Sequence, residues 1–203
     1  MPHVATGNKK LGKHIKNVNL LPVVTCVPGV PCAQKGPNGE PMPCYMDYCL
    51  RCRPNVVKSW TENTEQAENP EEFFRDLECE WRFSTPSLFR FFSAGDVPSV
   101  EFLREMVAFI RKHPETRFLV FTKRYTWWNR YRNLPSHLSL VYSAWPGWPM
   151  ENPHQRPVAW MRDVKNLDDR IPADAIECPG YCEECLVCWG LAQRGLSVVF
   201  DKH

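Results

Sequence analysis

The chain has 203 residues, of which 43% are hydrophobic and 24% charged, with a formal net charge of +2. This length suits one domain or one domain with a small lobe, and the charge by itself predicts neither a nucleic-acid nor a membrane partner. The basic N-terminal segment contains no apolar run of signal-peptide length, and no stretch approaches the roughly 20 apolar residues that span a bilayer. We therefore expect a cytoplasmic protein, in which disulfides are disfavoured and thiols stay free to bind metal.

Short apolar runs alternate with amphipathic stretches along the chain. We expect a first strand over 19–25, helices over 55–67, 70–82 and 98–112, a short helix within 122–132, and further strands over 88–92, 117–121, 138–142, 158–161 and 196–200. A loop rich in Pro, Gly and Cys follows the first strand over 26–53. Strands that alternate with helices are typical of parallel βαβ units. The sequence thus predicts a single α/β domain over 1–203, built on a partial parallel barrel or an open parallel sheet.

Polar or small residues follow each of the first four predicted strands. Cys26 follows the first strand, 93–96 (SAGD) the second, 122–124 (TKR) the third and Ser143 the fourth. In parallel sheets, binding sites gather at the carboxyl ends of the strands. We therefore expect these residues to share one rim of the sheet and to form one site.

Nine of the ten cysteines fall into two short segments. The first segment, 26–53, contains Cys26, Cys32, Cys44, Cys49 and Cys52, with five, eleven, four and two residues between them. The second segment, 178–189, contains Cys178, Cys182, Cys185 and Cys188, with three, two and two residues between them. The remaining thiol, Cys79, lies in a predicted helix and is typical of a small apolar residue. Because disulfides are not expected, the two clusters predict metal binding.

The spacing favours iron–sulfur over zinc. Cysteines separated by two residues can direct both sulfurs to one centre, and ferredoxin-type runs pack such cysteines closely, whereas zinc ribbons separate two pairs by a longer arm. Three of the five thiols of the first segment could hold a [4Fe-4S] cluster with one open iron, or all five could be divided with the second segment. We therefore expect one or two [4Fe-4S] clusters, with zinc as the alternative.

The order of several short motifs resembles a phage protein family, the gene product 88 domain family. These motifs are NKKLGK, LPVVTC, NVVKSWTEN, FRFFSAGDV, FTKR and a terminal cysteine pair followed by Trp and a strand. The same order is similar to a remote, shortened radical S-adenosylmethionine protein. The resemblance implies that Cys26, Cys32 and Cys44 hold a [4Fe-4S] cluster. It also implies that Cys185 and Cys188, with Cys178 or Cys182, form a second metal centre.

The resemblance further places Ser93, Gly95 and Asp96 near S-adenosylmethionine. Lys123 follows a predicted strand and could hold an anionic ligand. The sequence departs from the radical S-adenosylmethionine pattern in the long interval before Cys44 and in the additional Cys49 and Cys52. The leading hypothesis is redox or radical chemistry at a [4Fe-4S] cluster, and the sequence leaves open whether the protein is an enzyme.

Two other hypotheses stay open. The first is a zinc-stabilised module that recognises nucleic acid or a protein, and the second is an iron–sulfur electron carrier or sensor without catalysis. Aromatic residues interleaved with arginine can stack on bases, which makes nucleic acid a conceivable but not a favoured partner. These residues are Trp127, Trp128, Tyr131, Trp145, Trp148 and Trp160, with Arg124, Arg130 and Arg132. The last residue, His203, is a further candidate ligand.

Overall fold

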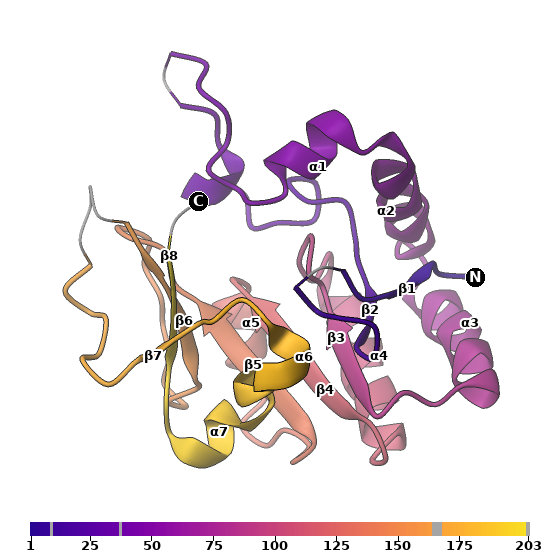
Figure 1. Cartoon of the computed structure of the whole chain (residues 1–203). Coiled ribbons are helices and arrows are strands. Elements are labelled where there is room, and N and C mark those ends of the chain that lie inside the picture. Colours follow the sequence, from indigo (N-terminus) through magenta and orange to yellow (C-terminus); the bar gives the residue numbers. More distant parts are fainter. Residues whose placement is uncertain (9, 37, 164–167, 202–203) are drawn as a thin grey trace.

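The computed structural model describes residues 1–8, 10–36, 38–163 and 168–201. Its centre is an eight-stranded sheet in the order β1-β2-β3-β4-β5-β6-β8-β7 (Figure 1). The strands are β1 (Val4–Thr6), β2 (Lys16–Val18), β3 (Leu88–Phe91), β4 (Arg117–Thr122), β5 (Leu138–Ser143), β6 (Val158–Arg162), β7 (Ile176–Glu177) and β8 (Val198–Asp201). The pair β1–β2 is antiparallel and the other pairs are parallel. This confirms the predicted α/β class and identifies the sheet as open.

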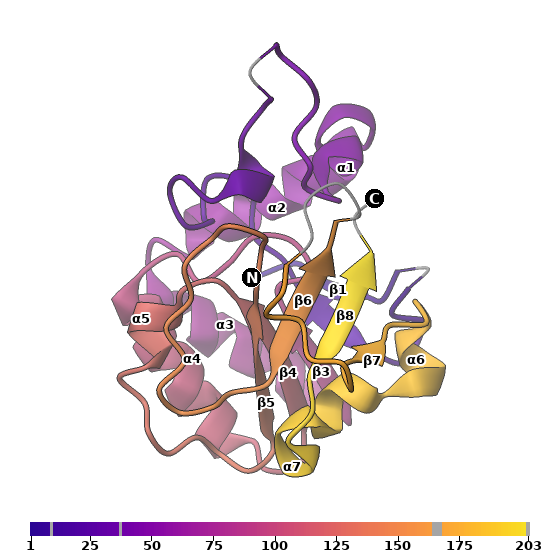
Figure 2. The ribbon, with the colours of Figure 1, turned by 90° about the vertical axis from the view of Figure 1, so that its left-hand side faces the viewer.

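Helices cover both faces of this sheet. They are α1 (Asp47–Cys52), α2 (Pro54–Gln66), α3 (Pro70–Phe83), α4 (Val100–Lys112), α5 (Tyr125–Trp128), α6 (Cys182–Cys185) and α7 (Leu191–Arg194), with 3₁₀ turns η1 (Pro31–Ala33) and η2 (Val187–Gly190). The side chains of Asn69 and Ser99 cap α3 and α4 by accepting hydrogen bonds from backbone N–H groups of the first turn. Figures 1 and 2 show α3 and α4 on one face of the sheet and α6 and α7 on the other. In the described part of the chain, no helix is long and apolar enough to cross a bilayer.

The alternation of side chains along the central strands decides what each face contacts. Phe89 and Phe91 of β3 belong to the large core beneath α3 and α4, with Phe118 of β4. Leu119 of β4 belongs instead to a second core, which includes residues of η2 and α7. Because successive strand residues point to opposite faces, Arg90 is directed toward this second face, which we call the inner face. The inner face therefore carries a cation among apolar residues.

The helices α2 to α5 and the strands β3 to β6 and β8 lie close to where the sequence predicts them. The predicted first strand over 19–25 is wrong, because the pairing strand is β2 and ends at Val18. Pro22 lacks a donor for a ladder hydrogen bond, and Val23 adopts a left-handed φ of 73°. The segment therefore turns, and the N–H of Thr25 donates to the carbonyl of Leu21. The edge strands β1 and β7 and the helix α1 inside the cysteine-rich loop were not predicted.

Candidate metal centre

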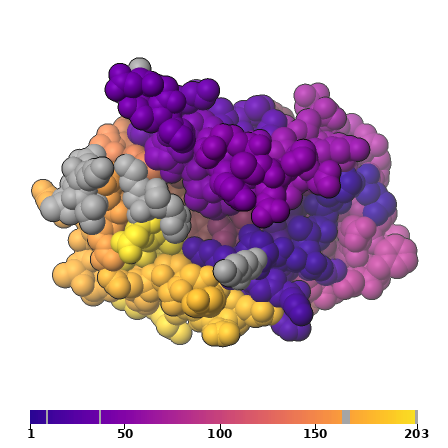
Figure 3. Space-filling view, turned by 45° about the horizontal axis from the view of Figure 1, so that its top comes forward, coloured from indigo at the N-terminus to yellow at the C-terminus, as the bar shows by residue number. Residues whose placement is uncertain are grey.

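A cavity of about 240 Å³ lies at the carboxyl ends of the parallel strands. Its walls include thiols of both cysteine segments and residues of the predicted rim: Cys26, Cys32, Cys44, Cys178, Cys182 and Cys188, with Ser93, Gly95, Asp96, Thr122, Lys123 and Ser143. The arrowheads of β6 and β8 in Figure 2 point toward the purple loop that carries the first cysteines. Figure 3 shows the surface hollowed between this loop and the yellow C-terminal segment. The expected rim therefore exists and brings the two cysteine segments together.

Three thiols of the first segment line the cavity: Cys26, Cys32 and Cys44. Cys26 accepts a hydrogen bond from the N–H of Val23, with 3.4 Å between nitrogen and sulfur. Burial nevertheless raises the pKa of Cys26 to about 11, and burial also raises the pKa of Cys44. Cys32 interacts electrostatically with both, and the positive charge of Lys123 favours their thiolate forms. Without a bound cation Cys26 and Cys44 stay protonated, as expected for ligands that lose a proton when metal binds.

Three thiols of the second segment lie on short helices, Cys182 and Cys185 on α6 and Cys188 on η2, and Cys178 follows β7. The N–H of Cys178 donates to the carbonyl of Val199 over 3.0 Å, and the N–H of Cys182 donates to that of Lys10 over 2.8 Å. The carbonyl of Cys188 accepts a 2.6 Å hydrogen bond from the hydroxyl of Ser139. These backbone contacts fix three thiols between α6, η2 and the sheet.

The thiols of the second segment also interact electrostatically with one another. Burial raises the pKa of Cys182, and it raises that of Cys188 to about 12. Arg90 opposes this effect at both thiols, while Cys178 and Cys185 add to it. All four thiols of the segment are therefore close enough to influence one another.

The loop after β3 is held to the rim by hydrogen bonds. The side-chain oxygen of Asn19 accepts from the N–H groups of Ser93 and Ala94, at 2.7 and 3.0 Å. The carboxylate of Asp96 accepts from the hydroxyl of Thr122 at 2.7 Å and from the N–H of Lys123 at 2.8 Å. Burial raises the pKa of Asp96 despite these bonds. Asp96 therefore positions the rim, whereas the buried hydroxyl oxygen of Ser93 has no hydrogen-bond partner.

Gly95 is required by a close approach of two loops. Its φ is 80°, and a Cβ at this position would lie 2.6 Å from the hydroxyl oxygen of Thr25 and 2.8 Å from the carbonyl oxygen of Leu20. A side chain would therefore push the 19–25 segment, and with it Cys26, away from the rim. The role that the structure gives Gly95 is to let the first cysteine reach the cavity.

Several predicted site residues lie elsewhere. Cys49 and Cys52 are on α1 and do not line the cavity, and Cys52 is exposed. Cys79 lies on α3. His203 lies outside the described residues. Within the described residues, no three or more His, Cys, Asp or Glu side chains are arranged around a single ion.

The Trp and Tyr residues of the aromatic cluster are buried or partly buried, and none is fully exposed. Trp128, Trp145 and Trp160 are buried. The guanidinium of Arg124 lies 4.3 Å from the centre of the Trp127 ring. It donates to the carbonyls of Thr25 and Cys26 at 2.8 and 3.1 Å, which fastens the first cysteine segment to the rim.

The sequence interpretation missed Arg90, Asn19 and Tyr45. The hydroxyl of Tyr45 donates to the carbonyl of Ser93, which ties the cysteine-rich loop to the loop after β3. The period-two pattern of β3 is a signal that could have identified Arg90, because it places this cation opposite the Phe89 and Phe91 face. No comparable pattern marks the other two residues, whose contacts join distant parts of the chain.

Comparison with known proteins identifies a family. No curated protein and no solved structure matches the chain. The family model for gene product 88 matches residues 3–188, which include the rim and all the cysteines. The chain therefore belongs to the gene product 88 family.

Proposed function

We propose that the protein binds one or two [4Fe-4S] clusters through its two cysteine segments and performs redox or radical chemistry in the cavity with S-adenosylmethionine. One observation carries the proposal: thiols from segments about 150 residues apart line one cavity at the carboxyl rim of a parallel sheet. Such rims are the usual binding sites of parallel α/β folds. A [4Fe-4S] cluster supplies one-electron transfer when it is bound.

The donor set of the first segment fits a cluster with one free iron. Cys26, Cys32 and Cys44 line the cavity, while the other two thiols of the segment lie on α1 and do not. Three thiolates leave one of four irons without a protein ligand. The loop after β3 borders the same cavity and presents the unpartnered hydroxyl oxygen of Ser93. These residues would hold the cluster and a cofactor beside it.

The donor set of the second segment fits a fully ligated centre. Its four thiols are electrostatically coupled, and three of them line the cavity. A centre with four protein thiolates has no open iron, so its proposed role is to pass electrons to the first or to orient substrate.

The spacing of the cysteines favours iron–sulfur over zinc. Zinc ribbons separate two cysteine pairs by a longer arm. Ferredoxin-type runs pack their cysteines closely, as Cys182, Cys185 and Cys188 are packed here with two residues between neighbours. A zinc-stabilised module that recognises nucleic acid or protein is the alternative.

The test is the metal content of anaerobically purified protein, with iron, sulfide and zinc measured on one sample. We expect iron and sulfide in equal amounts and a broad absorption near roughly 400 nm from thiolate-to-iron charge transfer. The triple variant Cys26→Ala, Cys32→Ala, Cys44→Ala should lose about four irons. The matched control, Cys49→Ala with Cys52→Ala, removes thiols from the same loop and should keep the full iron content.

Binding of S-adenosylmethionine separates the catalytic hypothesis from a carrier. We expect the cofactor to bind the iron-loaded protein and to perturb the spectrum of the cluster, and to lose this effect in the triple variant. A brown protein that does not bind it would be an electron carrier or sensor. A colourless protein with zinc and no sulfide would reject both iron–sulfur hypotheses in favour of the zinc module.

A further inference from the structure

Arg90 is a cation directed into an apolar wall of the cavity. It projects from the middle of β3 toward the inner face, and its guanidinium carbon lies 4.8 Å from the centre of the Phe121 ring. Its Nε atom is buried and has no hydrogen-bond partner. Stacking on an aromatic ring orients a guanidinium but leaves its N–H groups free to bind an anion in the plane.

No carboxylate of the described residues neutralises this charge. Arg170 and Arg162 are paired with carboxylates, at 2.7 Å from Asp168 and from Asp201. Three other arginines donate to backbone carbonyls: Arg117, Arg124 and Arg156. The carboxylates that line the cavity are Asp96 and Asp201, and both have other partners. A partly buried cation without a carboxylate partner is costly, so such a residue is expected where the thiolates of a loaded centre, a bound ligand, or both supply negative charge.

The position of Arg90 relates it to both cysteine segments. Its charge acts on Cys182 and Cys188 of the second segment and on Tyr45, the neighbour of Cys44 in the first. Lys10 and Lys123 also line the cavity and add positive charge. A ligand bound at Arg90 would therefore lie in the cavity that thiols of both segments line.

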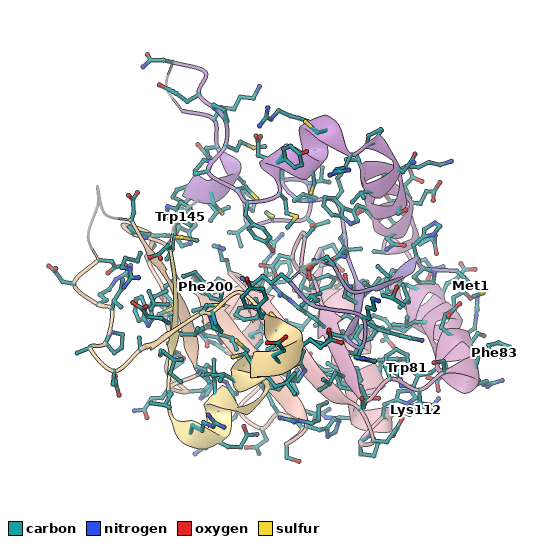
Figure 4. All side chains as sticks on the ribbon, viewed as in Figure 1. Met1, Trp81, Phe83, Lys112, Trp145 and Phe200 are labelled. Atoms are coloured by element: carbon teal, nitrogen blue, oxygen red, sulfur yellow. The ribbon has the colours of Figure 1, made fainter. Side chains whose placement is uncertain are left out.

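Much of the remaining cavity wall is apolar, and several of its residues are aromatic. It includes Phe92, Phe121, Trp145, Trp160 and Phe200. Figure 4 labels two of these residues, Trp145 after β5 and Phe200 on β8. A few placed polar groups in an apolar cavity are typical of sites for small organic molecules. The wall thus suits an apolar or aromatic body attached to one anionic group.

We propose that Arg90 binds the carboxylate or phosphate group of an organic substrate whose apolar body fills the cavity between the two cysteine segments. The role of this molecule as a substrate rests on the proposed function, but its binding requires only the cavity and the guanidinium. Both anions present two oxygens to the paired N–H groups of arginine, and this shared geometry is what the site recognises.

The test uses three probes with one aromatic frame: 1-naphthylacetate, 1-naphthyl phosphate and the uncharged 1-naphthylacetamide. Their dissociation constants are measured by equilibrium dialysis on anaerobically purified protein whose iron content is determined on the same sample. We expect at least one anion to bind about tenfold or more tightly than the amide. The tighter anion identifies the substrate as a carboxylate or a phosphate.

The variant Arg90→Met keeps a long apolar side chain and should lose this preference while binding the amide as before. Arg90→Lys should recover part of it, and Arg104→Met, which removes an exposed cation on α4, should change nothing. Retained amide binding shows that the variant is folded. The proposal is overturned if no probe binds the wild-type protein at millimolar concentration, if the amide binds as tightly as both anions, or if Arg90→Met keeps the preference. Absence of iron with an intact preference would reject the proposed function but not the anion site.

Discussion

The two cysteine segments line the same cavity but are held to the protein by different kinds of contact. The first is a loop that meets the rim through a few polar contacts, such as those from Arg124 and from Tyr45 to Ser93. The second is part of a hydrophobic core, in which Cys178, Cys182 and Cys188 pack with Trp189 and other apolar residues. The first segment is thus attached to the domain by polar contacts, whereas the second segment forms part of a hydrophobic core.

This difference predicts separate consequences when one segment or the other is disturbed. The inner face of the sheet is covered by the second segment, so a disturbance there exposes apolar surface and lowers the stability of the whole domain. The first segment buries few of its side chains, and in Figures 1 and 2 it rises above the sheet. A disturbance there should displace ligands with little effect on the core. The four predictions that follow test this contrast.

The largest effect is expected at the core beneath the second segment. Trp189 is 3% exposed, and its carbonyl accepts a 3.0 Å hydrogen bond from the guanidinium of Arg117. Trp189→Ala leaves a cavity in this core and should lower the free energy of unfolding by about 3–5 kcal/mol. Urea denaturation followed by circular dichroism measures the change.

The matched substitution in the first segment is Tyr48→Ala, which truncates an aromatic side chain that is 55% exposed on α1. It should change the free energy of unfolding by no more than about 0.5 kcal/mol. Equal losses in the two variants would show that the cysteine-rich loop is as much a part of the core as the C-terminal segment, and would remove the contrast.

A smaller loss is expected where the first segment meets the rim. Gly95→Ala adds a Cβ that would clash with Thr25 and Leu20, at a position with φ of 80°. Strain and overpacking together should cost about 2–4 kcal/mol. Gly147→Ala is the control, because its φ is 72° but no atom lies within 4 Å of the added Cβ. It should cost only about 1 kcal/mol from backbone strain.

Gly95→Ala should also disturb the backbone around Cys26 more than the backbone around Cys188. In Gly95→Ala the 19–25 segment must move, so we expect faster amide hydrogen exchange around Cys26, with exchange around Cys188 unchanged. Equal acceleration at both cysteines would contradict independent attachment of the two segments.

Arg124 gives a more local perturbation of the same junction. Arg124→Met keeps the packing against Trp127 but removes charge-assisted hydrogen bonds to the carbonyls of Thr25, Cys26 and Val97. The loss should be about 2 kcal/mol, because hydrogen bonds to charged groups contribute roughly 1.5–3 kcal/mol. Hydrogen exchange should accelerate at the first segment and stay constant at α6 and η2. Uniform acceleration would indicate that Arg124 stabilises the entire domain.

The local sequence pattern predicted many of the helices and strands but not all the residues that meet at the site. The helical spacing of Val107 and Ile110 and the alternation around Phe89 are properties of neighbouring residues, and the elements that they predict are present. The predicted strand before Cys26 was wrong because Pro22 and the left-handed Val23 override the apolar run. That error did not disturb the prediction that Cys26 shares a rim with the residues after β3 and β4.

The rest of the site depends on contacts that a single sequence does not encode locally. Arg124 meets Cys26 across 98 positions, and the hydroxyl of Tyr45 meets Ser93 across 48. Spacing also treated the five thiols of the first segment as equivalent, whereas a short unpredicted helix carries Cys49 and Cys52 away from the cavity wall. Which thiols share a centre is thus decided by tertiary structure.

The first segment therefore has thiols that line the cavity and thiols on α1 that do not. The smallest effect that we predict is a difference between their alkylation rates, with no change in stability. In reduced protein freed of metal by a chelator, iodoacetamide at pH 8 should label exposed Cys52 at least tenfold faster than Cys26 or Cys188. The thiolate is the reacting form, and burial raises the pKa of Cys26 to about 11 and that of Cys188 to about 12. At pH 8 only about one Cys26 thiol in a thousand is then ionised. The rate at Cys26 should therefore rise about tenfold with each pH unit up to about 11, as measured by mass spectrometry of labelled peptides. If Cys26 instead reacts as fast as Cys52, its thiol is exposed, and the cavity that joins the two segments does not persist without metal.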